Sequence, residues 1–593
     1  MTAGAACCRT FPERFEKEEK LVLSKRILTV VAVLLLAPVG GLAGGEKPAE
    51  PPRKIFAHFM GCYSAIAGAA PHHRMNNAHQ VDHTGDGKFD PIGDRWRNWP
   101  LAPYGLKVGW EESAKLDIRR ALRAGIDGFA VDAWAGNESP DVLDALITVA
   151  EREDYPFEVT ICLDPWCLPG GDKVSASADA INRVLDKHAD SPKLARRDGR
   201  PLIFGYSSPS IGWLYARWKW AERPEWKGKK IGEVQSSKGL RCTPEGWKLM
   251  AEAHEKIEEK VGRDLYFHYG IGAFYHRVPH RFREKDMKVR AAGFMAQRFD
   301  AIGEFLGRGP LYDRMAKAVR EAGAEWSQPL FFQYENINWG GNRISRGGDI
   351  LRQCWEQARR NESTLIQFVT WNDYTENTML APGYDTRYTI MELNRYYVDW
   401  WKNGEPPQTD RDRMYLMHQE YPQGAPMFPF KRKQRDSEKA LEVCTWLTEP
   451  ATVRLPDRDV EYAAPAGMSH RQFPLEVGPV VAELVRDGEV LHRLESPEPV
   501  TDLPYRPQNS LVCISTEFER HWKTDFPDAE PYLHSEYGDD DGDGLPNWFE
   551  MYWFGKFLDH STATVADPDA DPDEDGKTNL EEYRAQADPT RKP

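Results

Sequence analysis

Apolar runs of strand length alternate with amphipathic stretches over the first two thirds of the chain. Each run is almost continuously apolar or rich in β-branched and aromatic residues, which is typical of strands buried on both faces of a parallel sheet. We predict eight such strands, at residues 55–60, 128–133, 157–163, 202–206, 265–269, 293–297, 330–334 and 365–370.

The stretches between these runs carry apolar residues at helical spacing. Ser113 is placed as an N-cap before one periodic run, and Gly125 follows that run as a C-cap. Thr243, Pro244 and Glu245 give an N-cap, a first-turn proline and an early acid in the order of a helix start. The predicted helices are 113–124, 141–153, 178–189, 243–261, 310–322 and 348–361.

Strands that alternate with helices in this way indicate a parallel sheet covered by helices. Eight repeats favour a closed (β/α)8 TIM barrel, and a doubly wound open sheet is the alternative. Because 593 residues exceed the length of one such domain, further modules are expected.

The pattern changes after about residue 404. Two prolines at 406–407 and a charged run at 431–439 lead into a segment of short candidate strands, such as 451–455, 480–485 and 510–515. Short strands with turn residues between them favour a small β-sandwich. Packing against the barrel and glycan binding both remain open as its role.

The first 45 residues have the features of a signal-peptide region. Lys25 and Arg26 precede the apolar run 27–36, and small residues near Ala43 suit cleavage. The run is too short for a membrane span. We therefore expect a secreted, periplasmic or cell-surface protein without a stable membrane span once the signal is removed, and a translation start downstream of Met1.

The predicted domains are 1–45, the signal-peptide region; 52–405, the barrel; 430–527, the β-sandwich; and 536–593, an acidic tail. The formal net charge of -15, part of which lies in that tail, argues against nucleic acid or an anionic membrane as a partner. The 20 tryptophans include candidates for stacking on flat sugar rings, although most tryptophans in a large protein belong to its core.

Seven cysteines follow the signal-peptide region, and because the number is odd they do not indicate a complete set of disulfides. Cys444 and Cys513 are the expected pair, because both lie in the β-rich module. Cys162 and Cys167 are spaced too loosely for a zinc knuckle.

The tail contains two twelve-residue loops with the spacing of an EF-hand calcium site. Oxygen donors at loop positions 1, 3, 5, 7, 9 and 12, with glycine at position 6, are what Ca²⁺ requires, position 7 contributing its backbone carbonyl. We therefore predict structural Ca²⁺ sites, with the first loop formed by Asp539, Asp541, Asp543, Leu545, Asn547 and Glu550 and the second by Asp571, Asp573, Asp575, Lys577, Asn579 and Glu582. The tail resembles the dockerin-like or thrombospondin type 3-like tails of secreted bacterial proteins, and attachment to a cell surface or matrix through it is open.

Acids and aromatic residues recur at or just after the C-terminal ends of the predicted strands. In a barrel these ends meet in one mouth, where barrel enzymes carry out their chemistry. Any one of these residues could serve only as a turn former or a solvated side chain, as Asp164 before Pro165 could. Their co-location favours an active site that includes His58, Asp132, Trp134, Asp164, Tyr206, Tyr334, Glu335, Trp371 and Asn372.

The most informative stretch is TLIQFVTWNDYTEN at 364–377. A buried strand there is followed at once by Asp373 and Glu376, and both carboxylates must be solvated or paired. Two acids at the end of the last predicted strand are more useful to an active site than to stability.

The motifs KIFAHFM, ALRAGIDGFAVDAW and above all TWNDYTEN resemble glycoside hydrolase family 71, the α-1,3-glucanases, and more distantly the family 99 endo-α-mannosidases. The similarity covers about residues 54–401. The chain departs from the glucanase pattern at Thr375, Glu376 and Asn377, where that pattern has Gly-Glu-Ser, and the segment QYENINWGG has no close match.

The resemblance implies glycosidic-bond hydrolysis with inversion, Glu376 as general acid and Asp373 as general base, and no cofactor for catalysis. It implies that the acids and aromatic residues at the strand ends hold sugar hydroxyls and sugar faces. The expected substrate is an α-linked polysaccharide of α-1,3-glucan or α-mannan type. The alternative is a non-catalytic carbohydrate-binding or surface-display protein on the same barrel.

Overall fold

The computed structural model describes residues 51–66, 98–103, 106–132, 138–220, 244–272, 286–336, 341–343, 345–422, 440–503, 509–531, 535–555 and 562–592. The chain separates into two units, Met1–Pro51 and Pro52–Pro593. The predicted signal-peptide region and Trp134 lie outside the described residues. No helix in the described ranges is long and apolar enough to cross a membrane.

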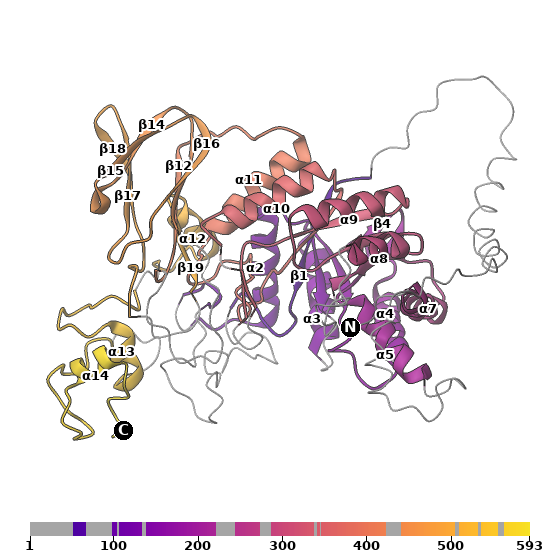
Figure 1. Cartoon of the computed structure of the whole chain (residues 1–593), viewed down its shortest axis with the longest axis horizontal. Coiled ribbons are helices and arrows are strands. Elements are labelled where there is room, and N and C mark those ends of the chain that lie inside the picture. The colour runs from indigo at the N-terminus through magenta and orange to yellow at the C-terminus, as the bar shows by residue number, and fades with distance from the viewer. Residues whose placement is uncertain are drawn as a thin grey trace, which may run out of the picture. The chain divides into compact units, whose positions relative to one another are not determined.

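Eight parallel strands form the barrel in the described part of the chain (Figure 1). They follow the order β3-β2-β1-β11-β8-β7-β6-β5, and pairing of β3 with β5 closes the ring. This closure confirms the (β/α)8 barrel and excludes the open sheet. The strands are β1 (Lys54–Phe59), β2 (Gly128–Asp132), β3 (Glu158–Leu163), β5 (Arg200–Gly205), β6 (Tyr266–Gly270), β7 (Ala301–Gly303), β8 (Glu325–Leu330) and β11 (Leu365–Phe368).

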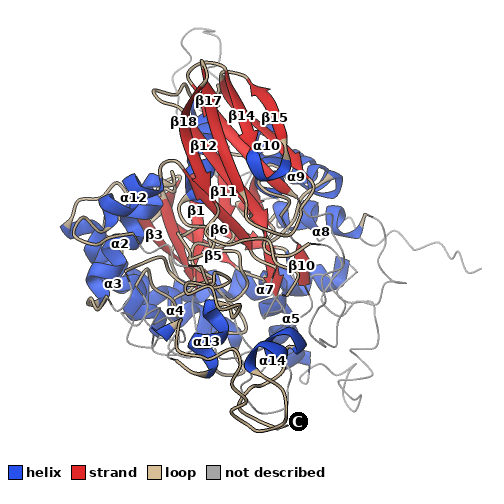
Figure 2. Cartoon of the chain, turned by 90° about the vertical axis from the view of Figure 1, so that its left-hand side faces the viewer, coloured by secondary structure: helices blue, strands red, loops and turns tan. Residues whose placement is uncertain are grey.

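Helices surround these strands, as Figure 2 shows. They pack apolar stripes on the outside of the barrel and keep charged residues toward solvent. They are α2 (Trp110–Arg123), α3 (Glu138–Arg152), α4 (Lys173–His188), α5 (Ser208–Trp220), α7 (Pro244–Val261), α8 (Met287–Ala296), α9 (Pro310–Glu321), α10 (Asp349–Arg360) and α11 (Thr389–Asn403). The short strand β4 (Arg196–Arg197) pairs antiparallel with β5.

Two of the predicted strands were misplaced. Residues 293–297 lie largely in α8, where Ala291, Ala292 and Met295 form its buried face. The strand there is β7, and its three residues are too few to produce an apolar run. Residues 330–334 mostly follow β8, whose polar residues Ser327 and Gln328 masked it as a strand.

Strand alternation divides the barrel core into an outer and an inner set. Phe56, Ala130, Cys162 and Phe204 belong to the apolar cluster inside the ring, whereas their sequence neighbours pack outward against helices. The next inward positions toward the C-terminal ends lie two residues further along each strand. They form a polar layer above the apolar one, made of His58, Asp132, Asp164 and Tyr206.

The second module has two four-stranded antiparallel sheets, in the orders β16-β13-β12-β19 and β15-β14-β17-β18. The first strand, β12, lies before the predicted module boundary at residue 430, because residues 413–419 already pair with β13 and β19. The strands are β12 (Arg413–Gln419), β13 (Leu441–Leu447), β14 (Ala451–Leu455), β15 (Val460–Ala464), β16 (Gly467–Phe473), β17 (Val481–Arg486), β18 (Glu489–Glu495) and β19 (Leu511–Ser515), followed by helix α12 (Phe518–Asp525).

The expected Cys444–Cys513 disulfide is wrong, since both cysteines are free. Cys444 pairs with Tyr415 and Cys513 with Met417, so strand β12 lies between the two thiols. Two strand spacings come to roughly 9–10 Å, which exceeds the Cα separation that a disulfide can span.

Buried ion pairs join the barrel to the second module. Arg352 of α10 donates from Nη1 and Nη2 to the two carboxylate oxygens of Glu442 on β13, at 2.6 and 2.7 Å. Arg120 of α2 donates to Asp525 of α12 at 2.7 Å, and the hydroxyl of Tyr388 donates to the same carboxylate at 2.8 Å. These paired charges make the two modules one packed unit.

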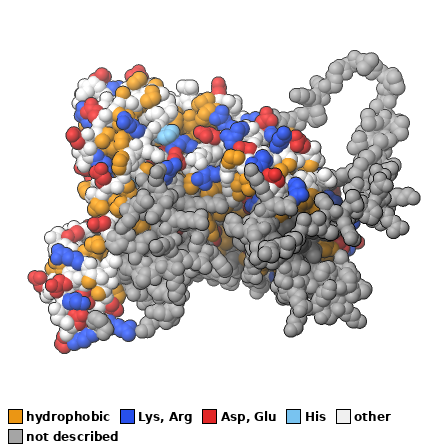
Figure 3. Space-filling view, viewed as in Figure 1, with side chains coloured by type: hydrophobic (Ala, Val, Ile, Leu, Met, Phe, Trp, Pro, Cys, Tyr) orange, Lys and Arg blue, Asp and Glu red, His pale blue; other side chains and the backbone are white. Residues whose placement is uncertain are grey.

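The tail carries two short helices, α13 (Asn547–Trp553) and α14 (Asn579–Ala585), each beginning within one of the acidic loops. Leu545, Trp548 and Phe549 form its small core, against which Leu580 and Tyr583 pack. Acidic side chains are exposed on the tail in Figure 3.

Candidate active site

The polar layer at the C-terminal end of the barrel brings together side chains from β1, β2, β3 and β5. The ring of Tyr206 lies 6.2 Å from that of His58 and 4.4 Å from that of Phe305. Burial lowers the pKa of His58 to about 3, so its imidazole is neutral. Burial also raises the pKa of Tyr206 well above its usual value, and the charges of Asp164 and Glu376 raise it further.

Asp373 follows β11 and is 6% exposed. Its Oδ1 accepts hydrogen bonds from the Thr375 backbone N–H at 3.1 Å, the Thr375 hydroxyl at 2.8 Å and the Glu376 backbone N–H at 3.0 Å. Burial raises the pKa of Asp373, and these hydrogen bonds oppose the rise. The carboxylate is therefore held in one orientation.

Asp132 belongs to the same electrostatic neighbourhood. Burial raises its pKa well above the usual range, and the charges of Asp164 and then Asp373 raise it further. The charge of Asp373 thus acts on Asp132, an acid far away in the chain. Three carboxyl groups from different strands therefore share the barrel mouth.

Glu376 is partly exposed, unlike Asp373. Its backbone carbonyl accepts a hydrogen bond from the N–H of Glu335 at 2.9 Å. Its carboxylate charge acts on Tyr206, which ties it to the same mouth. Glu335 and Tyr334 belong to β9 (Tyr334–Asn336), which forms a hairpin with β10 (Gly341–Arg343).

Residues of the second module hold the loop that carries the two acids. The Glu335 carboxylate accepts the backbone N–H of Asn509 through Oε1 at 2.9 Å and the amide of Asn377 through Oε2 at 3.4 Å. The amide of Asn377 also donates to the hydroxyl of Ser510 at 3.1 Å. We call these contacts of Glu335, Asn377, Asn509 and Ser510 the clamp. Glu335 was expected to contact sugar, but it is 4% exposed and bonded into the clamp.

Trp371 and Asn372 are fully buried on the barrel side of the loop. The indole N–H of Trp371 donates to Oδ1 of Asp117 on α2 at 2.7 Å. Oδ1 of Asn372 accepts the N–H of Met60 at 2.7 Å, and its amide donates to the Met60 carbonyl at 3.1 Å. These two expected sugar contacts anchor the loop to β1 and α2 in this structure.

Three features of the mouth were not found from the sequence. Phe305 lies beside His58 and Tyr206 but follows the strand that was misplaced. Asn509 and Ser510 come from another module, and no local pattern connects them to Asp373. Trp166, which is not among the predicted site residues, is 63% exposed and presents an aromatic face on the loop after β3.

The acidic loops of the tail have the arrangement of a cation site. One ligand oxygen from each of Asp539, Asp541 and Asp543 lies within 4.8 Å of the others. The glycine at loop position 6, Gly544, has φ +97°, which allows the tight turn that this loop needs. Glu550, at position 12, is completely buried, and its Oε2 has no hydrogen-bond partner in the described residues.

The second loop repeats this arrangement with Asp571, Asp573 and Asp575. Both carboxylate oxygens of Glu582 are buried without a hydrogen-bond partner among the described residues. Burial raises the pKa of Glu550 and of Glu582 to about 7, and neighbouring aspartates add to the shift. Asn547 of the first loop was predicted as a ligand, but its side-chain oxygen accepts the backbone N–H of Asp540 at 3.0 Å.

Residues 326–512 match the model of glycosyl hydrolase family 71. The matched segment begins in β8, includes Asp373 and Glu376, and ends in β19 of the second module. A closed (β/α)8 barrel with this match defines a glycoside hydrolase. The chain is a glycosidase similar to family 71.

Two solved structures of a family 99 endo-α-mannosidase from Bacteroides thetaiotaomicron are similar to the chain. One has 14% identity and a TM-score of 0.39, and covers 59% of this chain and 97% of its own. The other, in complex with BIS-TRIS-propane, has 13% identity and a TM-score of 0.37, with the same coverage. No curated protein matches the chain.

Proposed function

We propose that the protein is a secreted enzyme that hydrolyses an α-linked polysaccharide of α-1,3-glucan or α-mannan type. The main support is that the segment similar to family 71 contains Asp373 and Glu376 directly after the last barrel strand. Export through residues 1–45 would bring the enzyme to such a polymer outside the cytoplasm.

Glu376 acts as the general acid and gives its proton to the leaving glycosidic oxygen. Its partial exposure suits a group that must meet a substrate atom. Asp373 acts as the general base and takes a proton from the attacking water, which inverts the anomeric centre. The three hydrogen bonds to its Oδ1 fix the carboxylate while it does so.

Sugar rings bind at the polar layer and its rim. Hydrogen bonds to sugar hydroxyls come from the neutral imidazole of His58 and from the side chains of Tyr206, Asp132 and Asp164. Trp166 offers an exposed face for stacking. Trp371, Asn372 and Glu335 hold the catalytic loop in place of contacting the sugar directly.

The test is hydrolysis of α-1,3-glucan and α-mannan by the wild type, Asp373→Asn and Glu376→Gln, with the product anomer followed by NMR. Each variant should lose roughly 10²–10⁴-fold in kcat, because each removes one proton-transfer group. Asp313→Asn, at a partly exposed acid on α9, is the control and should keep full activity. Full activity in either active-site variant refutes the assignment, and glycan binding without hydrolysis by the wild type favours the carbohydrate-binding alternative.

The tail binds two Ca²⁺ ions that hold its small fold together. The buried, unpartnered carboxylate oxygens of Glu550 and Glu582 support this, because a buried carboxylate needs a proton, a hydrogen bond or a cation. Asp539, Asp541, Asp543 and the Leu545 carbonyl complete the first site. Asp571, Asp573, Asp575 and the Lys577 carbonyl complete the second, and the ions supply folding energy with no part in hydrolysis.

A further inference from the structure

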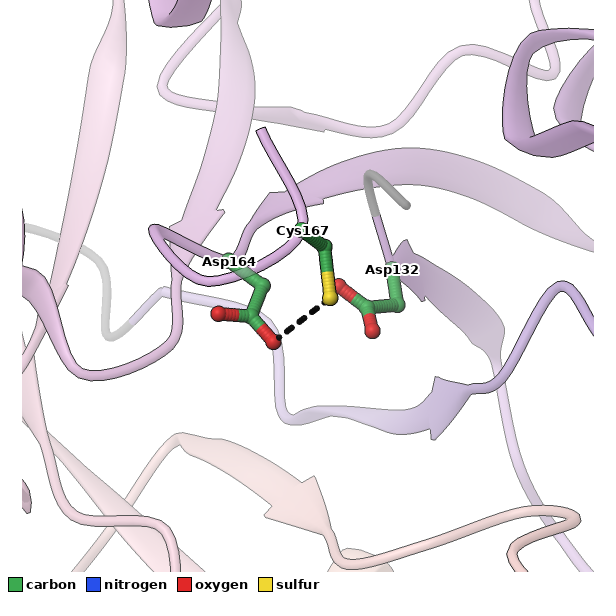
Figure 4. Close-up of side chains that lie close together, drawn as sticks. All are labelled: Asp132, Asp164 and Cys167. Atoms are coloured by element: carbon green, nitrogen blue, oxygen red, sulfur yellow. Dashed lines mark hydrogen bonds between the residues drawn. The ribbon is translucent and has the colours of Figure 1, made fainter. Parts of the chain in front are cut away.

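Asp132, Asp164 and Cys167 form a second group of metal-type ligands, inside the barrel mouth. One ligand atom from each lies within 4.8 Å of the other two, and all three residues are buried. Figure 4 shows the Asp132 carboxylate and the Cys167 sulfur pointing toward one another, with Asp164 on the other side of the sulfur. The Cys167 Sγ–Asp164 Oδ2 distance is 3.2 Å.

The cluster has acidic groups and incomplete hydrogen bonding. Asp132 is 1% exposed, and its Oδ1 accepts no hydrogen bond from the residues that the structure describes. Two carboxyls and a thiol so close together cannot all ionise in a buried site unless a cation joins them. The Asp132 carboxylate, which points toward the Cys167 sulfur and has an unpartnered Oδ1, is therefore a second indication of a missing ligand.

Two neighbouring strands place the three ligands, and a backbone hydrogen bond orients one of them. Asp132 ends strand β2, and Asp164 and Cys167 lie one turn apart on the loop after the neighbouring strand β3. The Trp166 backbone N–H donates to Oδ1 of Asp164 at 2.8 Å, which turns Oδ2 toward the sulfur. A partner that orients a ligating carboxylate in this way is typical of metal sites.

The donor set identifies the kind of ion. A thiolate is a soft ligand that Ca²⁺ and Mg²⁺ do not favour, whereas Zn²⁺ accepts sulfur and carboxylate oxygen together. With Zn–S near 2.3 Å and Zn–O near 2.1 Å, a tetrahedral ion holds its sulfur and oxygen ligands about 3.5 Å apart. The Cys167 Sγ–Asp164 Oδ2 distance of 3.2 Å is close to that value, and the Asp132 ligand atom lies within 4.8 Å of both.

We propose that Asp132, Asp164 and Cys167 bind a Zn²⁺-type transition-metal ion, with a fourth position open toward the barrel mouth. Binding releases the thiol proton together with any proton held by the two carboxyl groups, which leaves a thiolate and two carboxylates on the ion. The ion reduces the negative field that Asp132 and Asp164 place around Asp373 and offers a Lewis-acidic position for a vicinal sugar diol. The role toward sugar rests on the proposed function, whereas the ion site itself does not.

Cobalt(II) substitution tests the site without using activity. The full chain is stripped with chelator, saturated with Ca²⁺ and titrated with Co²⁺ under reducing conditions while the near-ultraviolet spectrum is recorded. A thiolate ligand produces an intense sulfur-to-cobalt charge-transfer band, which the all-oxygen loops of the tail cannot produce. We expect a stoichiometric band in the wild type that Zn²⁺ displaces.

The variants locate the ion. Cys167→Ser should abolish the band, and Asp132→Asn should weaken Co²⁺ binding by roughly 10–100-fold. Cys444→Ser, which removes a buried thiol from β13, should leave the band unchanged. Circular dichroism checks that each variant folds.

Absence of the band in the wild type, or its persistence in Cys167→Ser, overturns the inference. A cobalt band in a protein without glycosidase activity keeps the ion site and rejects the proposed function. Hydrolysis without a cobalt band keeps the proposed function and rejects the ion site, so the two failures are distinguishable.

Discussion

Replacing Glu335 by Gln tests whether the second module controls the catalytic loop. The carboxylate accepts the N–H of Asn509 and the amide of Asn377, while the Glu335 backbone N–H donates to the carbonyl of Glu376. Glutamine keeps the shape of the side chain but has one acceptor and one donor. Whichever way the glutamine amide is turned, its NH₂ group faces either the Asn509 N–H or the Asn377 amide, both of which are donors. One of the two hydrogen bonds is therefore replaced by a repulsive contact.

The magnitude follows from the loss of a buried, charged acceptor. Hydrogen bonds to charged groups contribute about 1.5–3 kcal/mol, and Glu335 is only 4% exposed, so little solvent screening applies. If the whole loss appears as misplacement of the catalytic loop in the transition state, kcat falls by about 10- to 150-fold. KM should change little, because the two carboxylate oxygens of Glu335 are bonded to Asn509 and Asn377.

The assay compares kcat, KM and Tm of Glu335→Gln with those of Glu498→Gln. Glu498 is an equally buried glutamate that accepts the backbone N–H groups of Glu536 and Tyr537 at 3.0 and 3.1 Å, away from the catalytic loop. Both variants should lose Tm, and only Glu335→Gln should lose kcat. Wild-type kcat in Glu335→Gln, or an equal loss in both variants, would refute the positioning role.

Three further outcomes concern stability. Glu442→Gln should lower the free energy of unfolding by up to about 3–5 kcal/mol in urea titration, because Arg352 stays buried without its bidentate partner; an unchanged midpoint contradicts this. Burial raises the pKa of Glu392 from 4.5 to about 8. The stabilisation that its protonated form contributes is therefore fully present below the unfolded pKa of 4.5 and is lost as pH rises through the folded pKa of about 8. Glu392→Gln should therefore raise Tm relative to the wild type at alkaline pH and not at acidic pH, and a pH-independent difference would reject the assigned ionisation. The double variant Glu550→Gln with Glu582→Gln should show no Ca²⁺ binding by calorimetry, and a chelator should lower the tail's thermal stability in the wild type only.

The barrel was predictable because most of its strands are buried on both faces and read as continuous apolar runs. The prediction failed where that signal was missing: β7 has three residues, and the apolar run assigned to it is the buried face of α8. The polar residues Ser327 and Gln328 of β8 shifted the predicted strand to the apolar residues that follow it. A long apolar run is enough to predict a strand from the sequence. A strand as short as β7 forms because it pairs with its neighbours in the barrel, and that pairing leaves no pattern in the sequence.

The candidate site was predictable only where its residues are local in sequence. Asp373 and Glu376 follow a strand within a few residues, so their position at the mouth could be read from the pattern. The burial of Trp371 and Asn372 depends on Asp117 and Met60, and no spacing in the sequence shows those contacts. The cluster of Asp132 with Cys167 exists only because β2 and β3 are neighbours in the closed ring.

The clamp between Glu335, Asn377 and the second module has a consequence for how such proteins can be recombined. The family 71 match continues past the last barrel helix and ends at residue 512, just beyond the two residues that hold the catalytic loop. A gene fusion or truncation cut after residue 405 would keep every barrel strand but discard the groups that fix Glu376. The smallest segment that keeps the loop together with its supporting groups is therefore the barrel plus the second module.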